Sequence, residues 1–180
     1  MNIRFEEDID LKETLQKEKE FKSYINTLAV EHMSLSQMQI LKVLTEGRNV
    51  YVSAGRRTGK TQALLTYAQC VNDGDVLIIS PTSKMKDEII RAGRSAGDMS
   101  RVHFTCSSDR YFPSVSHVLL DEMDYINPDD HIVEHLSRNI HNIKIKAVTS
   151  PRPGPSGLKN FVNSTLHGVP LFNHHIIHWG

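Results

Sequence analysis

The segment 54–61, with the sequence AGRRTGKT, constrains the fold of this chain more than any other stretch. It follows a short β-branched run, residues 49–53, and precedes a stretch of good helix formers, residues 61–71. The segment matches the pattern G-x-x-x-x-G-K-S/T, with alanine in the first glycine position. Because a strand comes before it and a helix after it, we predict a loop that wraps around the phosphates of a nucleotide.

The chemistry of a bound nucleoside triphosphate assigns a role to most residues of this loop. A triphosphate needs inward-facing backbone N–H groups, a cation beside the β- and γ-oxygens, and a hydroxyl for the metal ion. Lys60 supplies the cation and Thr61 the hydroxyl for Mg²⁺. Arg56 and Arg57 exceed what phosphate binding requires, so a guanidinium there stabilises charge on the γ-phosphate or pairs with acids of the resting site. The predicted nucleotide-binding residues of the loop are Ala54, Gly55, Arg56, Arg57, Thr58, Gly59, Lys60 and Thr61.

A second signal is the sequence HVLLDEMDYI at residues 117–126, in which an apolar strand ends in two adjacent carboxylates. In a parallel sheet, ligands bind at the carboxyl ends of the strands. We therefore expect Asp121 to hold Mg²⁺ through its water shell and Glu122 to polarise an attacking water molecule.

The remaining chain alternates apolar strands with helical stretches. Expected strands cover 75–80, 102–105, 115–120 and 143–149, and expected helices cover 36–46, 82–92 and 129–137. Continuous apolar strands are typical of a parallel sheet that is covered on both faces. The sequence therefore predicts a three-layer α/β domain with a mainly parallel central sheet flanked by helices.

The composition of the chain limits which partners it can bind. The chain has 180 residues, of which 39% are hydrophobic, enough for one compact domain. Lys plus Arg and Asp plus Glu both number 21, so any DNA contact must be local or shared between subunits. No apolar run is long enough to cross a membrane, and no membrane partner is expected. Cys70 and Cys106 lack C-x-x-C spacing and are expected to be buried thiols.

Two weaker signals flank the core motifs. The strand ending at Thr149 and Ser150 places two hydroxyls where they can sense a γ-phosphate, although such residues also form ordinary turns. Gln37 and Gln39 precede the first strand, where a glutamine amide can read the adenine edge or simply lie at the surface. Residues 1–33 are expected to form an amphipathic helical segment, and residues 34–180 the nucleotide-binding core.

These motifs, in this order, resemble the ATPase core of the large terminase subunit, the motor that packages DNA in tailed bacteriophages. The resemblance rests on LSQMQI at 35–40, GRRTGKT at 55–61, VLLDEMDYI at 118–126 and TSPRPGPSGLKNF at 149–161. It implies a P-loop NTPase fold of the RecA-like ASCE class, with ATP and Mg²⁺ as cofactors. The chain departs from the family at Ala54 and in the extra prolines, Pro153 and Pro155.

Carried over by residue, the resemblance makes Glu122 the catalytic carboxylate, Arg56 the loop arginine and Asp121 the support for Mg²⁺. Gln39 would contact adenine, and Thr149 and Ser150 would couple hydrolysis to movement. The implied partners are double-stranded DNA, the portal protein, the small terminase subunit and further copies in a homo-oligomeric ring, in the cytoplasm of the infected host cell.

Full terminase large subunits continue into a lid subdomain and a nuclease, and no nuclease is expected from this chain.

Two other functions fit parts of the pattern. Residues 121–124, DEMD, also suit the first motor domain of a superfamily 2 helicase. A nucleotide-dependent switch with little turnover is the third possibility, because the residues that complete the site can come from elsewhere.

Overall fold

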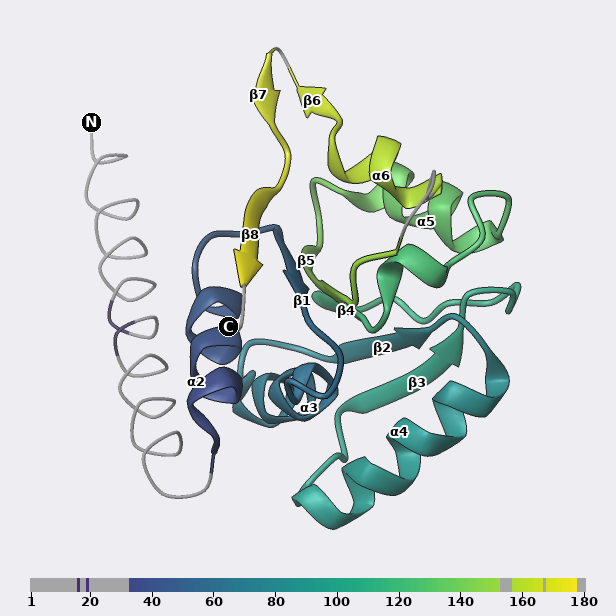
Figure 1. The fold of residues 1–180 in the computed structure, drawn as a ribbon. Helices are drawn as coiled ribbons and strands as arrows, with labels where there is room; N and C mark the ends of the chain where they lie inside the picture. Colours follow the sequence, from purple (N-terminus) through teal and green to yellow (C-terminus); the bar gives the residue numbers. More distant parts are fainter. Residues whose placement is uncertain (1–15, 17–18, 20–32, 153–156, 167, 178–180) are drawn as a thin grey trace, which may run out of the picture.

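A six-stranded parallel sheet forms the centre of the molecule. The computed structural model describes residues 16, 19, 33–152, 157–166 and 168–177, so the predicted N-terminal helical segment lies almost wholly outside them. The strand order is β3-β2-β4-β5-β1-β8, and every neighbouring pair is parallel (Figure 1). The strands are β1 (Val50–Ala54), β2 (Val76–Ser80), β3 (Val102–Cys106), β4 (His117–Leu120), β5 (Lys144–Thr149) and β8 (Asn173–Ile177).

Helices cover both faces of the sheet, as the sequence predicts. One apolar cluster joins one sheet face to α2 (Leu35–Leu44), α3 (Lys60–Cys70) and α4 (Ser83–Ala96). The other cluster joins the opposite face to the 3₁₀ turn η1 (Met123–Tyr125), α5 (His131–Asn139) and α6 (Gly157–Val162). Strand β2 shows why its apolar run is continuous: Val76 and Ile78 belong to the first cluster, and Leu77 and Ile79 to the second. The predicted three-layer α/β architecture is confirmed.

Local caps fix where the helices begin. Ser34 is the N-cap of α2, where its hydroxyl accepts from the backbone N–H of Gln37 while the Gln37 side chain accepts from the Ser34 N–H. Thr82 caps α4 in the same way through the N–H of Met85. Gly59 precedes α3 in the left-handed conformation, with φ of 78°.

A short antiparallel pair, β6 (Thr165–Leu166) and β7 (Val169–Pro170), leads into β8. Neither this pair nor β8 was expected from the sequence. Among the described residues, no helix is both long and apolar enough to cross a membrane. Both cysteines are buried, as predicted, and burial raises the pKa of the Cys70 thiol to about 11.

The strand order brings the predicted motifs together. Strand β5 lies between β4 and β1, and all three strands run in the same direction. The loop after β1, the acids after β4 and the hydroxyls after β5 therefore share the carboxyl edge of the sheet, where ligands bind in open α/β folds.

Candidate nucleotide-binding site

The loop between β1 and α3 is held by its own side chains. The Thr58 hydroxyl donates to the carbonyl oxygen of Gly55 at 2.9 Å. Arg57 has a φ of 61°, in the left-handed region that few residues other than glycine adopt. Lys60 is buried, and its Nζ donates to the carbonyl oxygens of Gly55 at 2.7 Å and Ala54 at 3.3 Å. The loop therefore closes around its own lysine, which places a positive charge at its centre.

Thr61 and Asp121 form the second part of the site. The Thr61 Oγ1 donates to Oδ1 of Asp121 at 3.1 Å, which joins the first turn of α3 to the end of β4. Burial, and then the negative charge of Glu122, raise the pKa of Asp121 to about 6. A hydroxyl beside a buried carboxylate is the oxygen donor set that Mg²⁺ takes when it also binds substrate phosphates, so these residues fit that metal.

Glu122 is held by the end of β5. Its Oε2 accepts from the backbone N–H of Ser150 at 2.7 Å, and its Oε1 accepts from the Ser150 hydroxyl at 2.8 Å. Lys60 Nζ lies 3.7 Å from Oε1 of Glu122. The backbone of Glu122 is left-handed, with φ of 48°. This turn directs the carboxylate back toward β5 and the loop lysine, so Lys60, Glu122 and Ser150 meet.

The Arg pair predicted in the loop borders an open pocket beside Glu122. Both arginines are exposed. The pocket has a volume of about 310 Å³ and is lined by Arg56, Arg57, Met85, Glu122, Tyr125 and Ser150. The Arg152 guanidinium lies 5.1 Å from the centre of the ring of Tyr125, one of the lining residues. The pocket therefore joins a carboxylate and several cations at one opening.

A buried network behind Glu122 was not expected from the sequence. The Tyr51 hydroxyl donates to the Asp124 carboxylate at 3.2 Å, and the Asp124 N–H donates to the Thr149 hydroxyl at 3.1 Å. Burial, followed by the Asp124 charge, raises the pKa of Tyr51. Asp124, the fourth residue of the DEMD sequence, is the one sequence feature that could have indicated this network. The network ties the turn that carries Glu122 to both β1 and β5.

The two predicted coupling residues have different surroundings. Thr149 is fully buried, and its hydroxyl donates to the carbonyl oxygen of Ser150. Of these two residues, it is Ser150 whose hydroxyl donates a hydrogen bond to the Glu122 carboxylate. The structure therefore places Ser150 in the site and Thr149 in the support beneath it.

The two glutamines near the loop also differ. Gln39 is exposed on α2. Gln37 packs against Gly59, so closely that a Cβ on this glycine would overlap the Gln37 side chain. Residues two apart on a helix point in different directions. The adenine contact of Gln39 stays a prediction, and Gln37 is the glutamine that the structure places against the loop.

Metal-binding clusters built from protein alone are not found in the described part of the chain, where no three His, Cys, Asp or Glu side chains are grouped for one ion. The Thr61–Asp121 pair is of another kind, since it depends on substrate phosphates for the remaining ligands.

Comparison with known proteins gives matches at the level of structure alone. No protein-family profile matches the sequence, and no curated protein is significantly similar to it. The large terminase of the thermophilic bacteriophage D6E superposes with a TM-score of 0.57 and 13% identity, over 81% of this chain and 46% of that one. The chain thus spans less than half of that terminase.

Two further structures help to place the fold. The ATPase domain of the Thermus phage P74-26 large terminase matches with a TM-score of 0.53 and 16% identity, over 76% of this chain and 79% of that one. The Arterivirus nonstructural protein 10, a helicase solved with DNA, matches with a TM-score of 0.51 and 16% identity, over 76% and 37% of the two chains. The chain therefore has the P-loop α/β fold that phage large terminases share with this viral helicase.

Proposed function

We propose that the chain is an ATP-hydrolysing motor domain of the terminase type, which powers the movement of double-stranded DNA into a viral capsid. The observation that carries the proposal is the meeting of Lys60, Glu122 and Ser150 at the carboxyl edge of the sheet, with the Thr61–Asp121 pair beside it. A second structure of the D6E terminase is a complex with ADP, which supports a nucleotide as the ligand of the proposed motor.

The proposed reaction is phosphoryl transfer from ATP to water. Glu122 accepts a hydrogen bond from the attacking water and orients it, and no covalent intermediate forms. Lys60 and Arg56 stabilise the negative charge that develops on the phosphate oxygens. Thr61 and Asp121 would hold Mg²⁺, which supplies further positive charge to those oxygens when it is bound.

Ser150 gives the site a means of responding to movement. In the structure, both carboxylate oxygens of Glu122 accept hydrogen bonds from Ser150. A shift of the end of β5 would therefore move this carboxylate within the pocket that it lines. We place the predicted coupling role on this contact, with Thr149 and Asp124 holding the strand end and the turn in register.

The partners of the proposed motor follow from the family that it resembles. They are double-stranded DNA, the portal protein, the small terminase subunit and a ring of identical chains, in the cytoplasm of the infected host cell. Because residues that complete such a site can come from a neighbouring chain, we expect slow turnover by the isolated chain and faster turnover when neighbours complete the site.

MgATP turnover by the purified chain, with and without duplex DNA, tests this proposal. We expect Glu122→Gln to lower turnover by about 100-fold or more while sparing nucleotide binding, because one positioned catalytic group is lost. Lys60→Ala should weaken nucleotide binding itself. Glu88→Gln and Lys42→Ala, which change exposed residues of α4 and α2, are the matched controls and should behave as wild type.

Three results would redirect the proposal. Wild-type turnover by Glu122→Gln would contradict the assigned site. Tight MgATP binding without turnover under any condition would support a nucleotide-dependent switch. Separation of DNA strands by the chain would instead support a helicase motor domain, which the DEMD sequence and the helicase fold also fit.

A further inference from the structure

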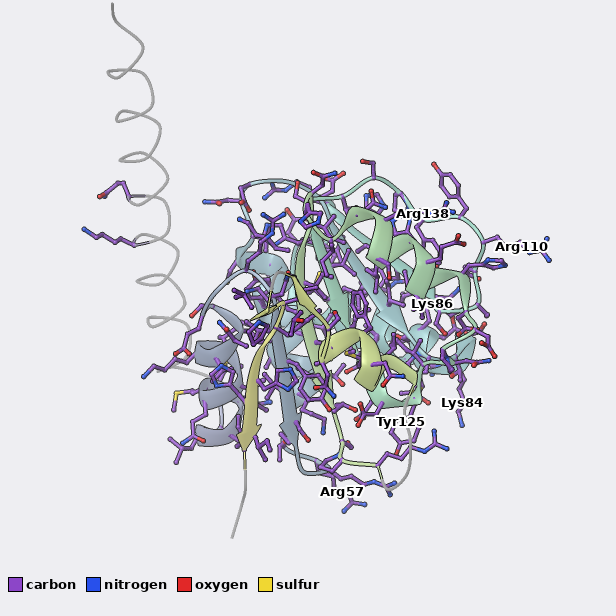
Figure 2. The ribbon with its side chains drawn as sticks, turned by 90° about the horizontal axis from the view of Figure 1, so that it is seen from above. Arg57, Lys84, Lys86, Arg110, Tyr125 and Arg138 are labelled. Carbon is purple, nitrogen blue, oxygen red and sulfur yellow. The ribbon has the colours of Figure 1, made fainter. Side chains whose placement is uncertain are left out.

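Six basic side chains come from four segments around the nucleotide pocket, and we call this group the basic band. Figure 2 shows four of them, Arg57, Lys84, Lys86 and Arg110, along one side of the molecule together with Tyr125. They come from the loop after β1, the first turns of α4, the loop after β3 and the segment after β5. The members of the basic band are Arg56, Arg57, Lys84, Lys86, Arg110 and Arg152.

Contacts between side chains show that these segments are neighbours. Met85, between the two lysines of α4, lines the same pocket as the loop arginines. Lys86 Nζ lies 3.9 Å from Oδ2 of Asp109, which brings Arg110 next to the start of α4. At the other end, Arg152 stacks on Tyr125, another residue of the pocket. The basic band therefore runs from the segment after β5, past the pocket, to the loop after β3.

Among the described residues, most members of the basic band form no close ion pair with a carboxylate. Within the described part of the chain, only Lys86 of its six members has a carboxylate oxygen within 4.0 Å. The chain as a whole has equal numbers of acidic and basic residues, so this concentration is local. Such a surface attracts a polyanion and loses that attraction as salt rises.

The side chains around the basic band distinguish the kind of polyanion. Protein interfaces usually have an apolar centre, whereas nucleic-acid surfaces are polar and positively charged. The large hydrophobic residues exposed here are two tyrosines, Tyr111 at 82% and Tyr125 at 38%, and the exposed aliphatic residues Leu35, Val169 and Ile176 belong to other elements. Arginine also pairs with phosphate oxygens through two parallel hydrogen bonds.

We propose that the basic band is a contact surface for the phosphate backbone of duplex DNA, placed against the nucleotide pocket of the same chain. The inference rests on the proposed function, and adds to it that this domain touches DNA directly and where. Because Arg56 and Arg57 belong both to the basic band and to the pocket, nucleotide and DNA share part of one surface. The DNA contact is then positioned to respond to the state of the nucleotide.

Salt-dependent DNA binding tests the inference without disturbing the nucleotide site. Lys84→Gln with Arg110→Gln removes two charges of the basic band that lie outside the pocket lining. Lys42→Gln with Arg94→Gln removes the same charge from the last turns of α2 and α4 and serves as the control. Binding of a short labelled duplex is measured by fluorescence anisotropy at several salt concentrations.

We expect the double variant of the basic band to reduce the slope of log affinity against log salt by about two, since each lost phosphate contact removes about one. Its affinity at low salt should fall about tenfold or more, and the control should bind as wild type does. Equal slopes for the two double variants, or the absence of duplex binding by wild type, would overturn the inference. Preference for single-stranded DNA would overturn it too.

Two added measurements separate the possible failures. Polyglutamate that competes as well as unlabelled duplex would overturn the inference in favour of an acidic protein partner. MgADP binding by both double variants, measured in the same samples, shows that they are folded. If turnover depends on Glu122 but the basic-band variant binds DNA as wild type does, the DNA surface alone is contradicted. If the variant changes the salt slope but the protein shows no turnover, the motor function is contradicted and the DNA surface stands.

Discussion

At the scale of single residues, Gln37 and Gln39 show how two similar side chains acquire different roles. Gln37 caps α2 through its carbonyl oxygen and packs on Gly59, while Gln39 is exposed. The capping bond leaves the Gln37 amide N–H groups to face the loop. This distinction depends on which face of α2 meets the loop, and the sequence segment 35–40 contains both glutamines without that information.

We therefore expect Gln37→Glu to weaken ATP binding by about fivefold, the effect of losing one hydrogen bond of about 1 kcal/mol. Glutamate at this position keeps the capping box with Ser34, so the change removes the amide donors and spares the helix start. Nucleotide titration followed by calorimetry measures the effect. Gln39→Glu is the matched control, and a larger loss for Gln39→Glu would support the adenine contact predicted for Gln39.

The residues of the site differ in how directly the chemistry of nucleotide binding determines their type. Lys60, Thr61 and Asp121 are predicted from the residue types and order that phosphate and metal binding require, and the structure brings Thr61 and Asp121 into contact. The contact between Ser150 and Glu122 depends on the left-handed turn at Glu122, and the role of Tyr51 depends on the pairing of strands distant in sequence. Side-chain contacts of that kind are not encoded in local pattern.

At the scale of elements, apolar runs predicted β1 to β5 to within two residues at each end, because buried parallel strands are continuously hydrophobic. Strand β8 lacked this signal. Its sequence, NHHII, is polar at its start and largely exposed, and it is a strand because β1 offers it a backbone edge. A largely exposed strand such as β8 is defined by its pairing, so tertiary structure rather than local pattern decides it.

The turn after β3 offers a test of pH dependence at this scale. Asp109 accepts from the Thr105 hydroxyl at 2.6 Å and the Cys106 N–H at 3.0 Å. These hydrogen bonds, that of Thr105 first, lower the pKa of Asp109 to about 2. The unfolded chain binds this proton more readily than the folded chain does. The Asp109 carboxylate therefore stabilises the folded state above pH 4, and this stabilisation is lost as the pH falls toward 2.

We expect Asp109→Asn to reduce the free energy of unfolding by about 1 kcal/mol at neutral pH, a modest value because the side chain is 41% exposed. Urea denaturation at several pH values measures it. The difference from wild type should shrink as the pH falls from 4 toward 2. A difference that stays constant over this range would show that the carboxylate charge has no part in holding the turn, and Asp87→Asn, on exposed α4, is the control.

At the scale of the whole molecule, stability depends on the two apolar layers that sandwich the sheet. Leu119 lies in β4 near the middle of the sheet and is fully buried in the cluster with α3. Leu119→Ala should lower the free energy of unfolding by about 2 to 5 kcal/mol, because it leaves a cavity between layers. Leu35→Ala, at 62% exposure, should change it by less than about 0.5 kcal/mol. Equal losses from the two changes, measured by chemical denaturation, would contradict the assigned core.

The place of β1 in the sheet has a consequence for how the protein is made. Val50 pairs with Lys146 on one side and with Asn173 on the other, so both neighbours of β1 are translated long after it. Contacts between distant parts of a chain form slowly, because a long loop must close first. As the chain leaves the ribosome, the strand that carries the nucleotide loop thus waits without partners, while β2, β3 and β4 can already associate. The proposed nucleotide loop is then flanked on both sides only after β8 has emerged, so we expect the loop to become ordered later than the β2–β3–β4 part of the sheet.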